Sequence, residues 1–352
     1  MRRIVRSRRF FLGALARLGG LALGFLSLLF PAAGAAAETR IRLATLLPRG
    51  SSHYHTLEAM GQKWRAAASG SISLTIYADG TMGSEADCVR RMRIGQIQAA
   101  TLSVGGLSEI DPSVGALEKI PMLYRSLEEL DYVRSRVEPQ LEQRLAARGF
   151  VVLFWADAGW VHIFSRQPAL RLVDFKKTKV FVGASDNNEV TIVKGLGFQA
   201  VPLEWSDVLT SLQTGLVDTV PTAPFLALAG QYDLVARHML DVNWVPLVGA
   251  TVITKKAWDA IPAQMREEFR KAAADAGKQM QARSRQESLE ATEAMKKRGL
   301  QVHAASPEVA EEWRQFAESV YPKIRGAMVP ADTFDEVVRL VKEFRASPAG
   351  GS

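Results

Sequence analysis

Residues 40–77 read RIRLATLLPRGSSHYHTLEAMGQKWRAAASGSISLTIY, which predicts a strand, a helix and a second strand in direct succession. The strands are expected at 40–46 and 73–77, where β-branched and apolar residues gather. Between them, 55–68 carries apolar residues three and four positions apart, which is the spacing of an amphipathic helix. A strand, a crossover helix and another strand form the basic unit of a parallel sheet, so this stretch points to an α/β fold.

The rest of the chain continues the alternation of strands and helices. The run VVLFW at 151–155 is apolar without alternation, as expected for a strand that is buried on both faces. The pattern predicts an α/β fold with a mixed, mostly parallel sheet in each half of the chain, and open sheets of this kind bind ligands at the carboxyl ends of their strands. The other predicted elements are a helix at 85–95 and strands at 99–104, 179–182, 200–201 and 251–254.

A long helix is predicted from about 262 to 297. This segment is rich in Ala, Glu, Lys, Gln and Arg, all good helix formers. Apolar residues recur at Phe269, Ala272, Ala276 and Met280, but the sustained heptads of a coiled coil, the alternative for so long a helix, are missing. We therefore expect one helix that spans two lobes.

Charge is unevenly distributed along the 352 residues. The net charge of +7 suggests a partner such as nucleic acid, yet six arginines and no acidic residue lie in 1–37. Without those six, 38 basic residues face 37 acidic ones. A mature chain of almost no net charge has no general attraction to polyanions.

The first 37 residues are predicted to be a signal peptide. A basic start precedes the apolar run 18–30, and Ala35-Ala36-Ala37 fits an A-x-A cleavage site, which places the mature protein in the periplasm. The run SRRFFL at 7–12 resembles a twin-arginine export signal; the alternatives are an ordinary secretory signal and a retained anchor. Cys88 is the only cysteine, so an intramolecular disulfide is excluded.

The sequence lacks the common motifs of catalysis. It has no G-x-S-x-G, H-E-x-x-H, Walker or G-x-G-x-x-G run, so no enzyme activity and no cofactor is predicted, and a periplasmic hydrolase is the weaker alternative. His53 and His55 flank Tyr54, but no third ligand follows at a familiar spacing. We therefore expect a polar loop at a cleft rim there and no metal site.

Several motifs, in order along the chain, together resemble the periplasmic binding subunit of tripartite ATP-independent periplasmic (TRAP) transporters, the DctP-type family. The segment LQTGLVD at 212–218 is similar to that family's "LQTGxVDG", and GTMGSE at 80–85 to its "GxLGxE". The remaining matching segments are 43–52, 93–98, 120–124 and 174–182.

The resemblance implies a two-lobed periplasmic-binding-protein fold with the ligand in the interlobe cleft. The lobes would close on the ligand and present it to a small and a large membrane subunit. The implied division is a signal peptide at 1–37, lobe I at 38–158 plus about 250–290, lobe II at 159–249 plus about 291–330, and a C-terminal helix and tail at 331–352.

Two departures from the family pattern bear on the ligand. Phe181 stands where the family usually has an arginine that pairs with the ligand carboxylate, and Thr222 matches an asparagine that supports it. A guanidinium gives a bidentate, charge-assisted grip that phenylalanine lacks. We therefore predict a hydrophobic or amphipathic ligand. The alternative is an organic acid held by another arginine, such as Arg49 or Arg125.

Aromatic residues fall on segments that face the cleft in the family. Phe181 is expected to form an apolar wall with Trp155 and Trp160; the alternative for any one of these rings is a place in the core. The predicted ligand-binding residues are Tyr54, Trp155, Trp160, His162, Phe181, Thr222, Phe225 and Trp244.

The chain resembles one branch of the family more closely. This branch contains the binding proteins that are associated with a tetratricopeptide-repeat partner (TatP-like), and its proposed ligands are hydrophobic. This likeness implies a periplasmic repeat protein as a further partner. A freestanding carrier of lipids or metabolites, without a transporter, is the alternative. The segments that carry the likeness are 50–52, 107–113, 157–162 and 244–251.

Overall fold

The computed structural model describes residues 38–184 and 187–347, which all fall in one compact unit. The predicted signal peptide, its cleavage site and the twin-arginine run lie outside the described residues. Among the described helices, none is both long and apolar enough to cross a membrane.

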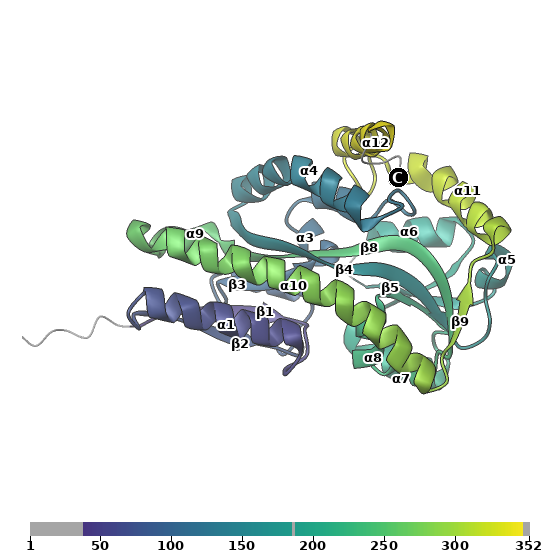
Figure 1. Ribbon diagram of the computed structural model, residues 1–352, viewed down its shortest axis with the longest axis horizontal. Helices are drawn as coiled ribbons and strands as arrows, with labels where there is room; N and C mark the ends of the chain where they lie inside the picture. Colours follow the sequence, from purple (N-terminus) through teal and green to yellow (C-terminus); the bar gives the residue numbers. More distant parts are fainter. Residues whose placement is uncertain (1–37, 185–186, 348–352) are drawn as a thin grey trace, which may run out of the picture. The chain divides into compact units, whose positions relative to one another are not determined.

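The described strands form one mixed sheet in the order β2-β1-β3-β8-β4-β7-β5-β6, with β9 paired to β8 (Figure 1). Its first half contains β1, which runs parallel to β2 and β3; its second half contains β5, which runs parallel to β6 and β7. This confirms the predicted α/β class and the mostly parallel pairing in each half. The strands are β1 (Thr39–Thr45), β2 (Ile72–Tyr77), β3 (Ala99–Ser103), β4 (Phe150–Ser165), β5 (Lys179–Gly183), β6 (Gln199–Leu203), β7 (Thr219–Thr222), β8 (His238–Thr254) and β9 (Gln301–Ala304).

Strands β4 and β8 are antiparallel to each other and belong to both halves of the sheet. The sequence predicted only their ends, 151–155 and 251–254. The polar Asp157 and the glycine Gly159 interrupt the apolar run of β4 and resemble a strand end. In the structure they form a bulge, where the Gly159 amide donates to the Asp157 carboxylate (3.3 Å) and Gly159 has a φ of +78° that suits glycine.

Helices follow the strands in the order expected of an α/β chain. The α-helices are α1 (Ser52–Ala67), α2 (Glu85–Arg93), α3 (Val104–Ser108), α4 (Leu127–Ala147), α5 (Leu172–Phe175), α6 (Asn187–Gly195), α7 (Val208–Thr214), α8 (Pro224–Ala229), α9 (Lys255–Ala260), α10 (Ala263–Lys297), α11 (Pro307–Ile324) and α12 (Ala331–Ala346). Three short 3₁₀ helices are η1 (Pro112–Leu117), η2 (Trp205–Asp207) and η3 (Tyr232–Leu234).

Helix α10 confirms the predicted long helix. It packs on α1 beside the first half of the sheet, on β4, and on α8 beside the second half (Figure 1). The four predicted apolar positions from Phe269 to Met280 are buried. The helix comes very close to β4 at Gly277, where an added Cβ would lie 2.7 Å from Cβ of Phe154.

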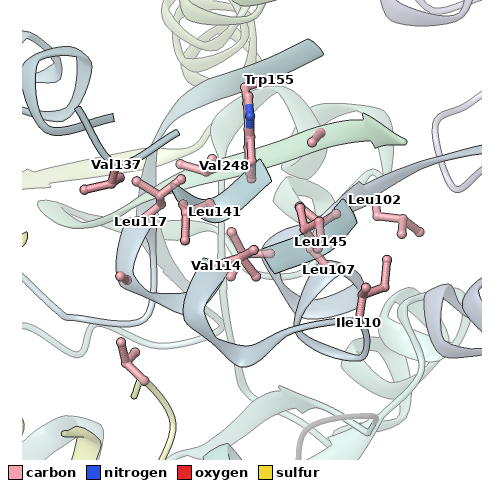
Figure 2. Close-up of a cluster of buried hydrophobic side chains, with 14 of the residues drawn as sticks. Leu102, Leu107, Ile110, Val114, Leu117, Val137, Leu141, Leu145, Trp155 and Val248 are labelled. Carbon is pink, nitrogen blue, oxygen red and sulfur yellow. The ribbon is translucent and has the colours of Figure 1, made fainter. Parts of the chain in front are cut away.

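A large hydrophobic cluster fills the space between α4, α3 and the sheet. Figure 2 shows Leu107, Val114, Leu141 and Leu145 in this cluster, together with Trp155 from β4. Cys88 is buried in the same cluster, and burial raises the pKa of its thiol to about 11. Apolar burial at roughly 25 cal/mol per Å² is the main stabilising contribution in a chain without disulfides.

Candidate functional site

A cavity of about 900 Å³ is lined by residues from both halves of the sheet and from α10 and α11. Most of its lining side chains are apolar. Among the described residues that line it, Lys119 is the only lysine or arginine. The acidic residues in the lining are Asp79, Glu85, Asp87, Glu118, Asp157, Glu189 and Glu204.

The start of α2 brings Glu85 to the cavity. Ser84 caps the helix and forms a capping box with Asp87. The Glu85 carboxylate accepts hydrogen bonds from Ser103 N (2.8 Å), Ser103 Oγ (2.6 Å) and Gly106 N (3.0 Å). Burial raises its pKa, although these three donors act in the opposite direction. Glu85 is thus a fixed part of the wall with its hydrogen bonds already formed.

Glu118 lines the cavity just after η1. Its Oε2 accepts a hydrogen bond from the backbone amide of Val248 on β8 (2.8 Å). Burial raises the pKa of Glu118 to about 8; the Val248 amide and Lys119 lower it, whereas Glu189 and Glu85 raise it further. At neutral pH its carboxyl group is therefore largely protonated.

His53 lines the cavity from the first turn of α1. Its ring stacks on Phe225 (centroids 5.0 Å apart), and Nε2 lies 2.5 Å from Ser284 Oγ on α10. Burial lowers the pKa of His53, although the Glu287 carboxylate opposes this shift, so the ring is neutral at pH 7. The predicted polar loop at a cleft rim is wrong here: Ser51 caps the helix, and His53 occupies the same buried face as Leu57 and Trp64.

Four of the predicted ligand-binding residues line the cavity: Phe181, Thr222, Phe225 and Trp244. Phe181 is only 4% exposed and packs edge-on against Trp205, with centroids 4.6 Å apart. Trp244 packs edge-on against Trp313 (5.5 Å). Thr222 is buried on β7, and its Oγ1 has no hydrogen-bond partner among the described residues. Buried hydroxyl groups are normally paired, so this unpaired hydroxyl group is unusual.

The other four predicted residues do not line the cavity. Phe154, Ala156 and Val161 line it, and the alternation along β4 points their neighbours Trp155, Trp160 and His162 elsewhere. Trp155 lies in the cluster of Figure 2 and donates to Glu142 Oε1 (3.2 Å), and Nδ1 of His162 lies 3.3 Å from the Asp241 carboxylate. Tyr54 is on α1, where its hydroxyl accepts from Arg49 (3.2 Å). The predicted wall of Phe181 with Trp155 and Trp160 is therefore not formed.

Sequence reasoning missed other residues of the lining. Trp205 supplies the aromatic contact to Phe181 that was assigned to Trp155 and Trp160, and Trp313 packs against Trp244. Glu118 adds a carboxyl group whose pKa is raised to about 8. Trp313 and Phe316 lie on one face of α11, and their i, i+3 spacing was the signal that could have identified them. Arg49 and Arg125, the arginines suggested for an acid ligand, are not in the lining.

The fold and the cavity are those of a two-lobed solute-binding protein. The sequence model of bacterial extracellular solute-binding protein family 7 (DctP) matches residues 43–326, and the chain belongs to this family. Proteins of this family are transport receptors rather than enzymes and act outside the cytoplasm, so the chain is a periplasmic receptor for a small solute of a TRAP transporter.

Among its relatives is a solute-binding protein of Verminephrobacter eiseniae, which is 23% identical over 321 residues (87% of this chain and 95% of that protein). The C4-dicarboxylate-binding periplasmic protein DctP of Rhodobacter capsulatus is 23% identical over 269 residues (76% and 80%). Among solved structures, the sugar acid binding protein DctPAm of Advenella mimigardefordensis, in complex with galactonate, matches with a TM-score of 0.81, at 20% identity over 87% of this chain and 99% of that one. The ligands named for the last two proteins, a C4-dicarboxylate and galactonate, are both acids.

Proposed function

We propose that the chain binds a small organic acid with one acidic group and a substantial apolar part, and delivers it to the membrane subunits of a TRAP transporter. The observation that carries this proposal is the lining of the cavity, which is mostly apolar and has Lys119 as its only lysine or arginine among the described residues.

The acidic group is suggested by the relatives, whose named ligands are a C4-dicarboxylate and galactonate. Lys119 carries the one positive charge of the described lining. A second carboxylate would lie in the same cavity as Glu85 and Glu189 without a second cation in the described lining, and burying an unpaired charge is costly. A monoacid therefore suits the cavity better than a diacid.

The apolar part is suggested by Phe181, Trp205 and Phe225, which line the cavity in the second half of the protein. A ligand that buries roughly 300 Å² of apolar surface gains several kcal/mol at ~25 cal/mol per Å², before the costs of association. The many hydroxyl groups of a sugar acid would find few partners on these rings, and each unpaired group reduces affinity.

The two lobes are proposed to meet at the crossing strands, with lobe I at 38–158 plus about 250–290 and lobe II at 159–249 plus about 291–330. The bulge at Asp157–Trp160 in β4 supports this division, because a bulge bends a strand locally. The tetratricopeptide-repeat partner and the TatP-like branch stay predictions. A pull-down from the native organism should recover that repeat protein, and recovery of the membrane subunits without it would reject this partner.

Native mass spectrometry of the purified protein, followed by calorimetry, tests the proposed ligand class. The panel should contain straight-chain monocarboxylates from butanoate to decanoate, aromatic monoacids, C4-dicarboxylates, galactonate and the alcohols matching the monoacids. We expect monoacids with an apolar body to bind more tightly than sugar acids, dicarboxylates and the alcohols. Tight binding of galactonate or a C4-dicarboxylate, with no binding of apolar monoacids, would contradict the proposal.

A further inference from the structure

Glu118 combines three features that set it apart from the other acidic residues of the cavity. It lies between η1 and the Lys119–Pro121 segment of the cavity wall, and only its Oε2 is held, by the amide of Val248. No arginine lies in the described lining of the cavity beside it. Glu85, by contrast, already accepts three hydrogen bonds, and Asp157 is paired with Arg285.

The charged groups that act on Glu118 come from three elements. Lys119 is its neighbour in the chain, Glu85 lies on α2 in the first half, and Glu189 lies on α6 in the second half. Burial is the largest effect and keeps the proton on Glu118; the Val248 amide and Lys119 oppose it, and the two carboxylates add to it. A protonated carboxyl group is both a donor and an acceptor of hydrogen bonds.

We propose that Glu118 is a specificity-determining residue that recognises the acidic group of the ligand by donating the O–H of its protonated carboxyl group to a ligand carboxylate oxygen. One proton is then shared between the two carboxyl groups, and no other bond forms or breaks. Hydrogen bonds of this O–H···O⁻ type are short and among the strongest in proteins. This inference rests on the proposed function and adds to it the group that selects an acid in a cavity whose described lining has no arginine.

Binding of an acid should therefore depend on pH in a defined direction. Below about pH 8, Glu118 is protonated and the site can bind an acid. Above that pH, an ionised Glu118 repels the ligand carboxylate, and the affinity should fall by up to about tenfold per pH unit, with net proton uptake on binding. A ligand bearing an ammonium group would show the opposite trend, because it would bind an ionised Glu118.

The experiment measures the affinity of the tightest straight-chain monocarboxylate of the panel from about pH 6.5 to about pH 9.5 by calorimetry, in buffers of different ionisation enthalpy. Glu118→Gln keeps an N–H donor but cannot ionise, so its affinity should be nearly independent of pH and only a few-fold weaker than that of the unmodified protein near pH 7. Glu118→Ala should lose about tenfold or more near pH 7, because no donor remains. Glu109→Gln, at an exposed position outside the cavity, is the matched control.

The inference fails if the monocarboxylate binds with the same affinity across this pH range and without proton uptake, or if Glu118→Gln loses as much affinity as Glu118→Ala. The proposed function fails differently, because then no monocarboxylate of the panel binds to the unmodified protein at any pH. Circular dichroism and thermal unfolding of both variants would identify a folding defect. If either variant misfolds, proton uptake by the unmodified protein alone still decides the question.

Discussion

Arg285 on α10 donates two hydrogen bonds to Asp157 on β4, from Nε to Oδ1 (2.8 Å) and from Nη2 to Oδ2 (2.7 Å). The contact lies at the bulge where β4 passes from one half of the sheet to the other. The Asp157 side chain has no solvent exposure and also pairs with Arg134 of α4 (3.2 Å). Arg285 in turn bonds Asp131 on α4, and these carboxylates raise its pKa against the effect of burial. The long helix and the crossing strand are thus fixed to each other at one ionic network.

Removing this pair should destabilise the protein. Asp157→Asn leaves two guanidinium groups facing a neutral amide in a buried site, and breaking a buried ion pair costs about 3–5 kcal/mol. Because Arg285 is partly exposed, we expect the lower end of that range. Urea unfolding would measure it. Arg339→Gln, which breaks only exposed pairs with Glu336 and Glu343, should change stability little, and equal losses in the two variants would contradict the assignment.

Phe181→Arg should weaken binding of the natural ligand at least tenfold, because it places a charge among apolar side chains. The same change should improve binding of galactonate or a C4-dicarboxylate, since a guanidinium restores a bidentate carboxylate partner. Calorimetry with both ligand types would measure this exchange. Phe181→Leu is the control for lost packing against Trp205; similar binding profiles for the two variants would reject a role for charge.

Glu118 should also make the stability of the unliganded protein depend on pH. The pKa of Glu118 is about 8 in the folded state, against the ordinary value of 4.5. Between these two pH values, the folded state therefore keeps a proton that the unfolded state has lost. Stability therefore falls as pH rises from about 4.5 to about 8. Glu118→Gln removes this loss of stability. The free energy of unfolding of the variant, relative to that of the unmodified protein, should be roughly 2–3 kcal/mol higher near pH 8 than at pH 5, after allowing for solvent in the cavity. Thermal unfolding of both proteins at these two pH values would measure it, and a gain independent of pH would contradict it.

His53 should contribute a loss of stability in acid. Its folded pKa is lowered by burial, so the unfolded state binds a proton more readily below about pH 6.5. The stability that neutral His53 contributes is fully present above that pH, and it is lost as the pH falls from there through the pKa of His53 in the folded state. His53→Gln should unfold at a lower pH than the unmodified protein in an acid titration followed by tryptophan fluorescence. His55→Gln, on an exposed side chain of the same helix, should not change the midpoint.

Gly277→Ala separates two opposing effects on α10. Helix propensity alone would make the alanine variant more stable by about 1 kcal/mol. The added Cβ would lie 2.7 Å from Cβ of Phe154, however, so α10 must shift away from β4. We expect a net loss of about 1–3 kcal/mol in urea unfolding. Gln279→Ala, at an exposed position of α10, should be nearly neutral, and a gain at Gly277 would show that α10 is free to move from the sheet.

The elements with strong local patterns were predictable from the sequence. The strand, helix and strand of residues 40–77 and the long helix with buried Phe269 and Met280 have periodicities that local sterics and burial determine. The crossing strands were predicted too short because the Asp157–Trp160 bulge resembles a strand end. A bulge becomes recognisable only when the partner strand β8 is known.

The candidate site could be predicted only in part. Phe181 and Thr222 could be placed because the resemblance to the family aligns them with positions that contact the ligand there. Trp155 and Trp160 could not, because which face of β4 meets the cavity depends on its register and on the bulge between them. Glu118 carries no local signal at all, since its protonation results from burial by elements far apart in the sequence.

The buried Cys88 makes this receptor convenient for spectroscopy. A thiol with a pKa near 11 has almost no thiolate at neutral pH and reacts slowly with maleimides. Two cysteines introduced at exposed positions, for example Lys63 on α1 and Lys297 at the end of α10, can therefore carry a donor and an acceptor dye without removal of the native cysteine. The efficiency of energy transfer between the dyes would then report how far the receptor opens and closes, molecule by molecule, as each candidate acid is added.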